Sequence, residues 1–75
     1  MSTPEFEDVY ARTRTQVLAV CLQVTGDRVL AEDAFQETYF LVCKHLSGFR
    51  GESRVSTWVF RIALRVSERD AVETG

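Results

Sequence analysis

The sequence is poor in proline, glycine, cysteine and histidine, with one, four, two and one of these residues in 75 positions. This composition excludes collagen-like and low-complexity chains. Two cysteines are too few for a disulfide framework, and we predict that Cys21 and Cys43 are small buried apolar residues. No stretch approaches 18 apolar residues, so no membrane span is predicted. The N-terminus lacks the basic and apolar regions of a secretory signal, which makes a cytoplasmic location the default expectation.

The residues that are present are typical of one small globular domain. Hydrophobic residues make up 45% of the chain and charged residues 27%. The formal net charge of −2 argues against a protein that coats nucleic acid by bulk charge. Residues 1–49 carry four basic and seven acidic side chains, whereas residues 50–75 carry five and four. This asymmetry suggests two surfaces with different partners.

Few side chains in the sequence could support catalysis or metal binding. The single histidine, His45, has no nucleophile arranged near it, and no glycine-rich phosphate loop with its lysine precedes a helix. Cys43 and His45 would point about 200° apart on a helix, so they cannot share one metal ion. We therefore predict that the chain is not an enzyme and has no metal site and no cofactor.

Apolar residues at three- and four-residue spacing predict two helices in the first part of the chain. The first begins near positions 2–4, where Pro4 suits the first helical position, and ends at Gly26 in the left-handed conformation. The second spans 28–46 and is capped by Asp27. The residues expected to face inward are Phe6, Val9, Tyr10, Val17, Val20, Cys21, Val24, Leu30, Ala34, Thr38, Leu41, Val42 and His45.

A third helix is predicted to begin between positions 53 and 56, with Ser53 or Ser56 as its cap, and to run to about 69. The glycine-containing segment 47–53 before it is expected to form a loop. Residues 70–75 lack periodicity and are expected to be a linker stub or frayed C-terminus. The fold class is therefore all-α, a small bundle of three or four helices in one domain over 1–69. The residues of the third helix expected to face inward are Val55, Val59, Ile62, Ala63 and Val66.

One face of the second helix combines polar groups with a large aromatic side chain. Asp33, Gln36, Glu37 and Phe40 fall at i, i+3, i+4 and i+7, and Tyr39 lies beside them in the sequence. An acidic helix face is often only a solubilising surface. Exposed aromatic rings next to fixed polar groups favour the alternative, a protein interface.

Aromatic residues and arginines interleave in the loop and the third helix. Guanidinium groups contact phosphates and aromatic rings stack on unpaired bases, so this pattern indicates binding of single-stranded or melted nucleic acid. The alternative is an amphipathic helix whose arginines keep it soluble. The residues concerned are Phe49, Arg50, Arg54, Trp58, Phe60, Arg61 and Arg65.

Four short runs occur in the order and at the spacing of a known family, and the resemblance covers about positions 6–69. They are TGD at 25–27, AEDAFQET at 31–38, FRGES at 49–53 and TWVFRIA at 57–63. Together they resemble region 2 of bacterial sigma-70-family RNA polymerase sigma factors, most closely the extracytoplasmic-function (ECF) group. The resemblance implies the sigma region 2 type of helix bundle and a non-catalytic role in transcription initiation.

The resemblance implies that Asp33, Gln36, Glu37 and Phe40 bind core RNA polymerase at the clamp helices of its largest subunit. Carboxylates and an amide suit hydrogen bonds to basic residues on a rigid coiled coil. An anti-sigma factor is a second implied partner. The alternative that stays open is a sigma-like interaction module that binds polymerase or an anti-sigma factor without reading a promoter.

The resemblance also implies that the loop and third helix bind the promoter −10 element. In the family these segments hold the non-template strand after melting, with one flipped base in a pocket made by the loop. The implied DNA-binding residues are Phe49, Arg50, Ser53, Thr57, Trp58, Phe60, Arg61 and Arg65.

The sequence departs from the family pattern at several points. Arg65 stands where Asn is usual, Arg69 where an acidic residue is common, and Phe60 where Tyr is usual. The basic tail that often follows is absent from residues 70–75. Region 4, the helix-turn-helix that binds the −35 element, is not among the 75 residues, so the sequence is either an excised domain or a natural protein with region 2 alone.

Overall fold

The computed structural model describes residues 4–49 and 54–74, which form four helical elements in chain order. These are α1 (Pro4–Thr25), α2 (Arg28–His45), the short 3₁₀ helix η1 (Leu46–Gly48) and α3 (Val55–Thr74). No strand occurs within these two described ranges. The all-α fold class predicted from apolar periodicity is therefore confirmed.

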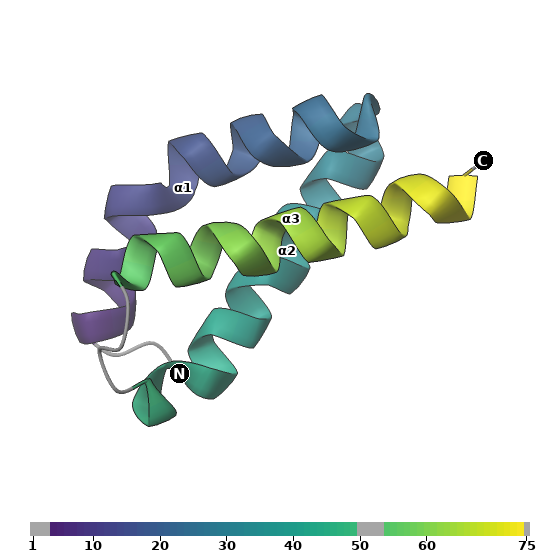
Figure 1. The fold of residues 1–75 in the computed structure, drawn as a ribbon. Helices are drawn as coiled ribbons and strands as arrows, with labels where there is room; N and C mark the ends of the chain where they lie inside the picture. Colours follow the sequence, from purple (N-terminus) through teal and green to yellow (C-terminus); the bar gives the residue numbers. More distant parts are fainter. Residues whose placement is uncertain (1–3, 50–53, 75) are drawn as a thin grey trace.

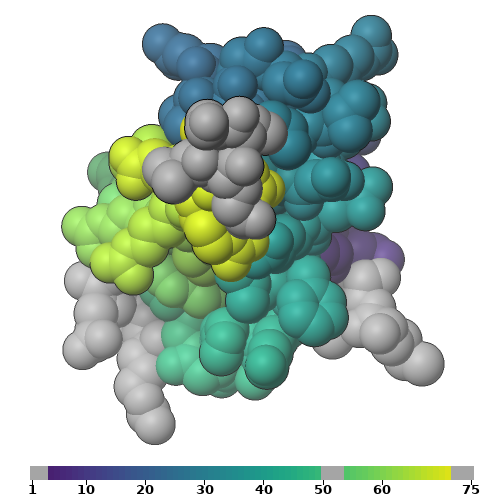
Figure 2. All heavy atoms as spheres, turned by 90° about the vertical axis from the view of Figure 1, so that its right-hand side faces the viewer, coloured from purple at the N-terminus to yellow at the C-terminus, as the bar shows by residue number. Residues whose placement is uncertain are grey.

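The three long helices pack so that each contacts the other two. In Figure 1, α1 and α3 run side by side in the same direction, and α2 crosses behind them as it returns along the molecule. This arrangement brings η1 and the start of α3 to one end of the bundle. Figure 2 looks at the opposite end, where the residues of the α1–α2 connection lie above the last turns of α3.

The core is built from small and medium side chains of all three helices. Val17, Val42 and Val59 are fully buried, one from each helix. Thr13, which the apolar pattern did not predict, is also buried, because its hydroxyl donates to the Val9 carbonyl oxygen at 2.8 Å and is thereby satisfied. The buried apolar residues are Val9, Val17, Cys21, Ala31, Ala34, Tyr39, Val42, Val59, Ala63 and Val66.

The two-residue connection between α1 and α2 follows the predicted signals. Gly26 has φ +65, in the left-handed region that favours glycine, and its N–H donates to the Leu22 carbonyl at 2.9 Å. Asp27 is extended, and its carboxylate accepts a hydrogen bond from the Leu30 N–H at 3.0 Å. These hydrogen bonds satisfy backbone groups at the end of α1 and at the start of α2.

Some predicted element boundaries are wrong. The chain leaves α-helical geometry after His45 and forms η1 over part of the predicted loop. Because α3 begins at Val55, Ser56 lies inside its first turn and does not cap it. The other proposed cap of this helix, Ser53, lies outside the described residues.

The third helix also continues beyond its predicted end at about 69, as far as Thr74. Asp70 is still packed against the bundle, since its side chain is only 13% exposed. It lines a hollow with Leu30 and Asp33 of α2, so α3 has a surface to pack on past Arg69. The assignment of 1–69 as the domain, with 70–75 as a linker stub, stays a prediction.

Three predictions about burial on α2 are also wrong. His45, expected to face inward, is exposed because α2 ends there and the chain turns into η1. Of the two cysteines, Cys21 is buried as predicted, but Cys43 is exposed because the preceding Val42 takes the inward position. Tyr39, expected to be exposed beside Phe40, is only 5% exposed.

Tyr39 is buried because it lies at the centre of an aromatic cluster. Its ring meets those of Phe6, Tyr10 and Phe35 edge-to-face, with centroids 6.2, 4.8 and 5.0 Å apart. The Thr13 hydroxyl lies 2.5 Å from the Tyr39 hydroxyl. The Thr13 hydroxyl has one hydrogen and donates it to the Val9 carbonyl oxygen. The Tyr39 hydroxyl is therefore the donor in its hydrogen bond with Thr13.

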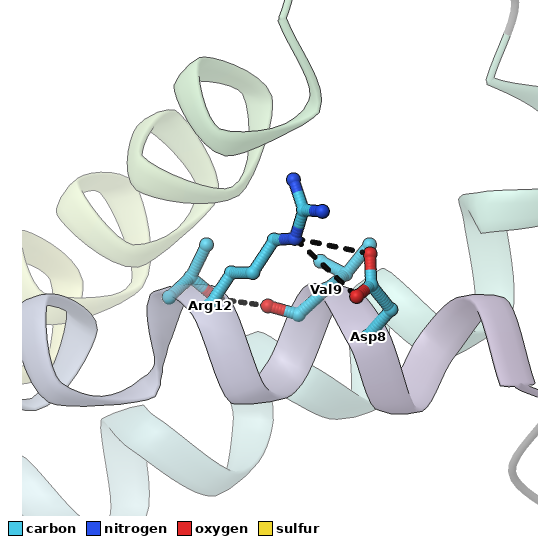
Figure 3. A network of polar contacts seen from close by, with 4 residues as sticks. Asp8, Val9 and Arg12 are labelled. Atoms are coloured by element: carbon cyan, nitrogen blue, oxygen red, sulfur yellow. Dashed lines mark hydrogen bonds and ion pairs between the residues drawn. The ribbon is translucent and has the colours of Figure 1, made fainter.

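The outer side of α1 is polar and carries an ion pair one turn apart. The Arg12 Nε lies 3.2 Å from a carboxylate oxygen of Asp8, and both side chains are largely exposed (Figure 3). The same view shows the Val9 carbonyl that accepts the buried hydrogen bond from Thr13. Exposed pairs of this kind contribute little to stability, so they leave the fold dependent on apolar burial.

The described part of the chain contains no helix that is both long and apolar enough to span a membrane.

Candidate protein and nucleic-acid interfaces

The outward face of α2 displays the residues predicted to bind a protein. Asp33 and Gln36 are exposed, and Phe40 is 65% exposed although phenylalanine is usually buried. Asp33 makes no ion pair or hydrogen bond with any residue in the described ranges. This face therefore presents an unpaired carboxylate, an amide and an aromatic ring on one regular helix.

Glu37, the fourth predicted residue of this face, lies at its edge and is already engaged. It is half-buried and forms an ion pair with Arg69 of α3. The hydrogen bond to Glu37 raises the pKa of the Arg69 guanidinium above its ordinary value. The pair joins the outward face of α2 to the arginines of α3, so the two candidate surfaces are continuous at this point.

Two predicted DNA-binding aromatics meet at the start of α3. Phe49, which follows η1 in an extended conformation, contacts Trp58 with ring centroids 5.1 Å apart and planes tilted by 33°. Both rings are half-buried, and Trp58 packs against the core. The contact explains a phenylalanine in a predicted loop, since its ring lies against the tryptophan.

The arginines predicted to contact DNA extend from this aromatic pair along α3. Trp58, Arg61, Arg65 and Arg69 follow at three-, four- and four-residue spacing, which keeps them on one stripe of the helix. The guanidinium-bearing residues of the stripe are exposed. Thr57 is exposed next to the stripe. The stripe can therefore offer cations to a phosphate backbone that passes the aromatic pair.

Phe60 does not join this stripe. At about 100° per residue, Phe60 lies on the edge of α3 opposite to Trp58. It lines a hollow with Val9, Thr13 and Gln16 of α1, whereas Arg65 lines a hollow with Leu41 of α2. The sequence grouped Phe60 with Trp58 because they are near in the chain, but the helix separates them.

Arg50 and Ser53, the remaining predicted DNA-binding residues, lie outside the described residues. The geometry of the predicted base pocket therefore rests on Phe49 and on the residues of α3 alone.

Comparison with known proteins agrees with the resemblance carried by the four sequence runs. The family model described as Sigma-70 region 2 matches residues 9–70. The chain belongs to the sigma-70 region 2 family. The matched span includes α2, η1, the candidate surface on α2 and the stripe on α3.

Curated relatives of this region 2 chain include sigma factors of two bacteria. It is 44% identical over 50 residues to the ECF RNA polymerase sigma factor SigG of Mycobacterium tuberculosis, covering 67% of this chain and 14% of the relative. It is 27% identical over 70 residues to the RNA polymerase sigma-H factor of Pseudomonas aeruginosa, covering 93% of this chain and 36% of the relative. The chain thus spans a minor part of either relative. No solved structure matches the chain at a significant level.

One exposed residue on the α2 face of the region 2 chain was missed at the sequence level. Val29 is 67% exposed and lies eleven positions before Phe40, on the same outward stripe. The sequence does contain a signal for it: Val29 is an apolar residue outside the set of α2 positions expected to face inward. It also lies outside the polar motif that defined the α2 face.

Proposed function

We propose that the chain acts as region 2 of a sigma factor in transcription initiation. The outward face of α2 binds core RNA polymerase at the clamp helices of the largest subunit, through Asp33, Gln36, Glu37 and Phe40. The observation that carries this proposal is an exposed phenylalanine beside an unpaired carboxylate on a regular helix, within a region 2 chain. Exposure of the Phe40 ring to water is unfavourable, and the carboxylate beside it attracts cations. The face therefore suits a basic, partly apolar partner.

The second part of the proposed function is binding of the melted −10 element. The Phe49–Trp58 pair offers a stacking platform for the bases of the non-template strand, and Arg61 and Arg65 bind its phosphates. Thr57 lies close enough in sequence to contribute a hydroxyl, and Arg50 and Ser53 are assigned from the family pattern alone. Phe60 lies on the other edge of α3, where it packs against the core and stabilises the start of the helix. No bond is made or broken in this process.

The proposed role needs no catalytic residue and no cofactor, and it places the chain with polymerase in the cytoplasm. Regulation by an anti-sigma factor is part of the proposal, since such a factor would compete for the same α2 face. The packing of α2 against α3 in one bundle supports the proposal that polymerase and DNA are held together through this domain.

The test is co-purification of the chain with core RNA polymerase. Wild type should be retained, and Gln36→Arg should be lost, because it places a cation on a face that binds basic residues. Gln23→Arg is the matched control, since Gln23 is exposed on α1 and is not part of the face. Retention of all three chains, or of none while circular dichroism shows each one folded, would contradict the proposed polymerase face.

A second candidate function is a module that binds polymerase or an anti-sigma factor without reading a promoter. Two observations favour it: Arg65 stands at a position where the family usually has Asn, and Phe60 faces away from Trp58. Titration with single-stranded oligonucleotides of −10-like sequence separates the two candidates. Salt-sensitive binding supports promoter recognition, and absence of binding at low salt supports the interaction module.

A further inference from the structure

The two most exposed large apolar side chains of the described residues lie on the same helix. Val29 is 67% exposed and Phe40 is 65% exposed, whereas Leu18, Leu22 and Leu64 are between 37% and 43% exposed. Isolated exposed apolar residues are common, but these two share one stripe. Asp33 and Gln36 occupy the positions between them.

The four side chains form a straight row along α2. Their spacing is four, three and four residues, which is the spacing of a coiled-coil seam. At 1.5 Å per residue, Val29 and Phe40 are about 16 Å apart along the helix axis. The row is apolar at both ends and polar in the middle, where Asp33 is the one charge and has no ion-pair partner in the described parts of the chain.

A narrow row of this length fits a second helix better than it fits a concave surface. Two helices that lie nearly parallel bring side chains three turns apart into contact at both ends of the row. The two other acidic side chains that flank the row are engaged within the domain: Glu32 pairs with Arg28 at 3.6 Å, and Glu37 pairs with Arg69. Attraction to a cation would therefore act at Asp33, between two apolar contacts.

We infer that Val29 is a second apolar anchor of the α2 face, and that the partner is a helix aligned along α2. That partner helix would carry apolar residues about three turns apart with a basic residue between them, opposite Asp33. The inference rests on the proposed function for the identity of the partner, core RNA polymerase. It adds a contact residue and the alignment of the partner helix along the α2 axis.

The experiment measures the affinity of the 75-residue chain for core RNA polymerase with Val29→Ala, Phe40→Ala and the double variant. Alanine has a higher helix propensity than valine, so Val29→Ala should not weaken α2. We expect Val29→Ala to lower affinity about three- to tenfold, from the loss of buried methyl groups. The two losses should multiply in the double variant, because the sites are too far apart to share contacts.

Leu64→Ala is the matched control, since Leu64 is an exposed apolar residue on α3 outside the row. It should leave polymerase affinity unchanged, and Val29→Leu should retain most of the wild-type affinity. If wild type binds and Val29→Ala binds equally well, the inference is wrong while the proposed function stands. If wild type does not bind core polymerase, the proposed function fails and the inference fails with it. Equal losses in Val29→Ala and Leu64→Ala would also overturn the inference, because the effect would not be specific to the row.

Discussion

The outward face of α2 and the stripe on α3 reach the surface in different ways. On α2, Asp33, Gln36 and Phe40 are exposed on one side of a regular helix. On α3, Trp58 is half-buried against the core and covered on one side by Phe49 from beyond η1. Helix periodicity is enough to place these three residues of the α2 face, whereas the α3 surface depends on tertiary packing. Substitutions on α2 should therefore affect binding alone, and those at the aromatic part of α3 should affect binding and stability together.

The largest expected effect separates the buried side of α3 from its exposed stripe. Val59→Asp places an unpaired charge at a fully buried position and should destabilise the fold by about 4 kcal/mol or more. For a domain of this size that loss amounts to unfolding. Thermal melts followed by circular dichroism measure it. Arg61→Asp, on the exposed side of the same helix, is the control and should melt close to wild type.

Trp58→Ala should sharpen the contrast between the two surfaces. Loss of the stacking platform should weaken binding of a single-stranded −10-like oligonucleotide by at least about fivefold, measured by fluorescence anisotropy. Polymerase co-purification should persist, because the α2 face is unchanged. Phe60→Ala is the matched control, since Phe60 is also half-buried but lies on the opposite edge of α3. A similar loss of DNA affinity in both variants would mean that the two edges of α3 do not differ in function.

Neighbouring residues on α2 provide a finer test of the same contrast. Tyr39→Phe removes the hydrogen bond from the Tyr39 hydroxyl to Thr13 and should cost about 1 kcal/mol of unfolding free energy, measured in urea. It should not change polymerase affinity, because Tyr39 is buried. Phe40→Ala should weaken polymerase binding and leave the unfolding free energy nearly unchanged. If Tyr39→Phe weakened polymerase binding while leaving stability intact, the division of α2 into inward and outward faces would be wrong.

The buried tyrosine also predicts a loss of stability in alkaline solution. Burial raises the pKa of Tyr39 above its ordinary value of 10.0, against the smaller lowering effect of the hydrogen bond with Thr13. Above pH 10.0 the unfolded chain therefore loses this proton before the folded chain does, and folding stability falls as pH rises. Urea unfolding at increasing pH should show this decline in wild type. The decline should be smaller in Tyr39→Phe, and an identical slope in both chains would refute the assignment.

The smallest expected effect lies where the two surfaces meet. Arg69→Ala frees Glu37 from its ion pair, and the melting temperature should barely change because the Arg69 side chain is 54% exposed and the pair lies at the surface. Removing a cation beside an acidic face should raise the association rate with core polymerase about twofold, measured at low salt. Arg14→Ala removes an exposed cation from α1 and should leave the rate unchanged. A slower rate in Arg69→Ala would show that Arg69 itself contacts polymerase.

Much of the fold could be predicted from sequence, because its signals are local. The cap at Asp27, the turn at Gly26 and the apolar periodicity each depend on residues within a few positions. The error at Tyr39 concerns a residue whose burial is decided by a distant helix. Tyr39 is buried because α1 supplies Phe6, Tyr10 and Thr13, and no rule of spacing on α2 contains that information.

The candidate sites divide in the same way. Helix periodicity correctly placed Asp33, Gln36 and Phe40 together, since one turn of helix fixes their relation. It could not show that Glu37 is paired with Arg69, because that contact joins residues 32 positions apart. It also could not separate Phe60 from Trp58, which were grouped by composition rather than by their angle around α3.

The parallel alignment of α1 and α3 has a consequence for the order of folding. Val9 and Val17 of α1 are buried in a bundle whose third helix is the last to be synthesised. An α1–α2 hairpin formed earlier would leave the valines that α3 covers in contact with water. The core can therefore close only after a loop of roughly 40 residues has been ordered, which slows folding relative to a bundle of sequential hairpins. Until α3 emerges from the ribosome, the nascent chain is an incomplete domain that a chaperone can recognise.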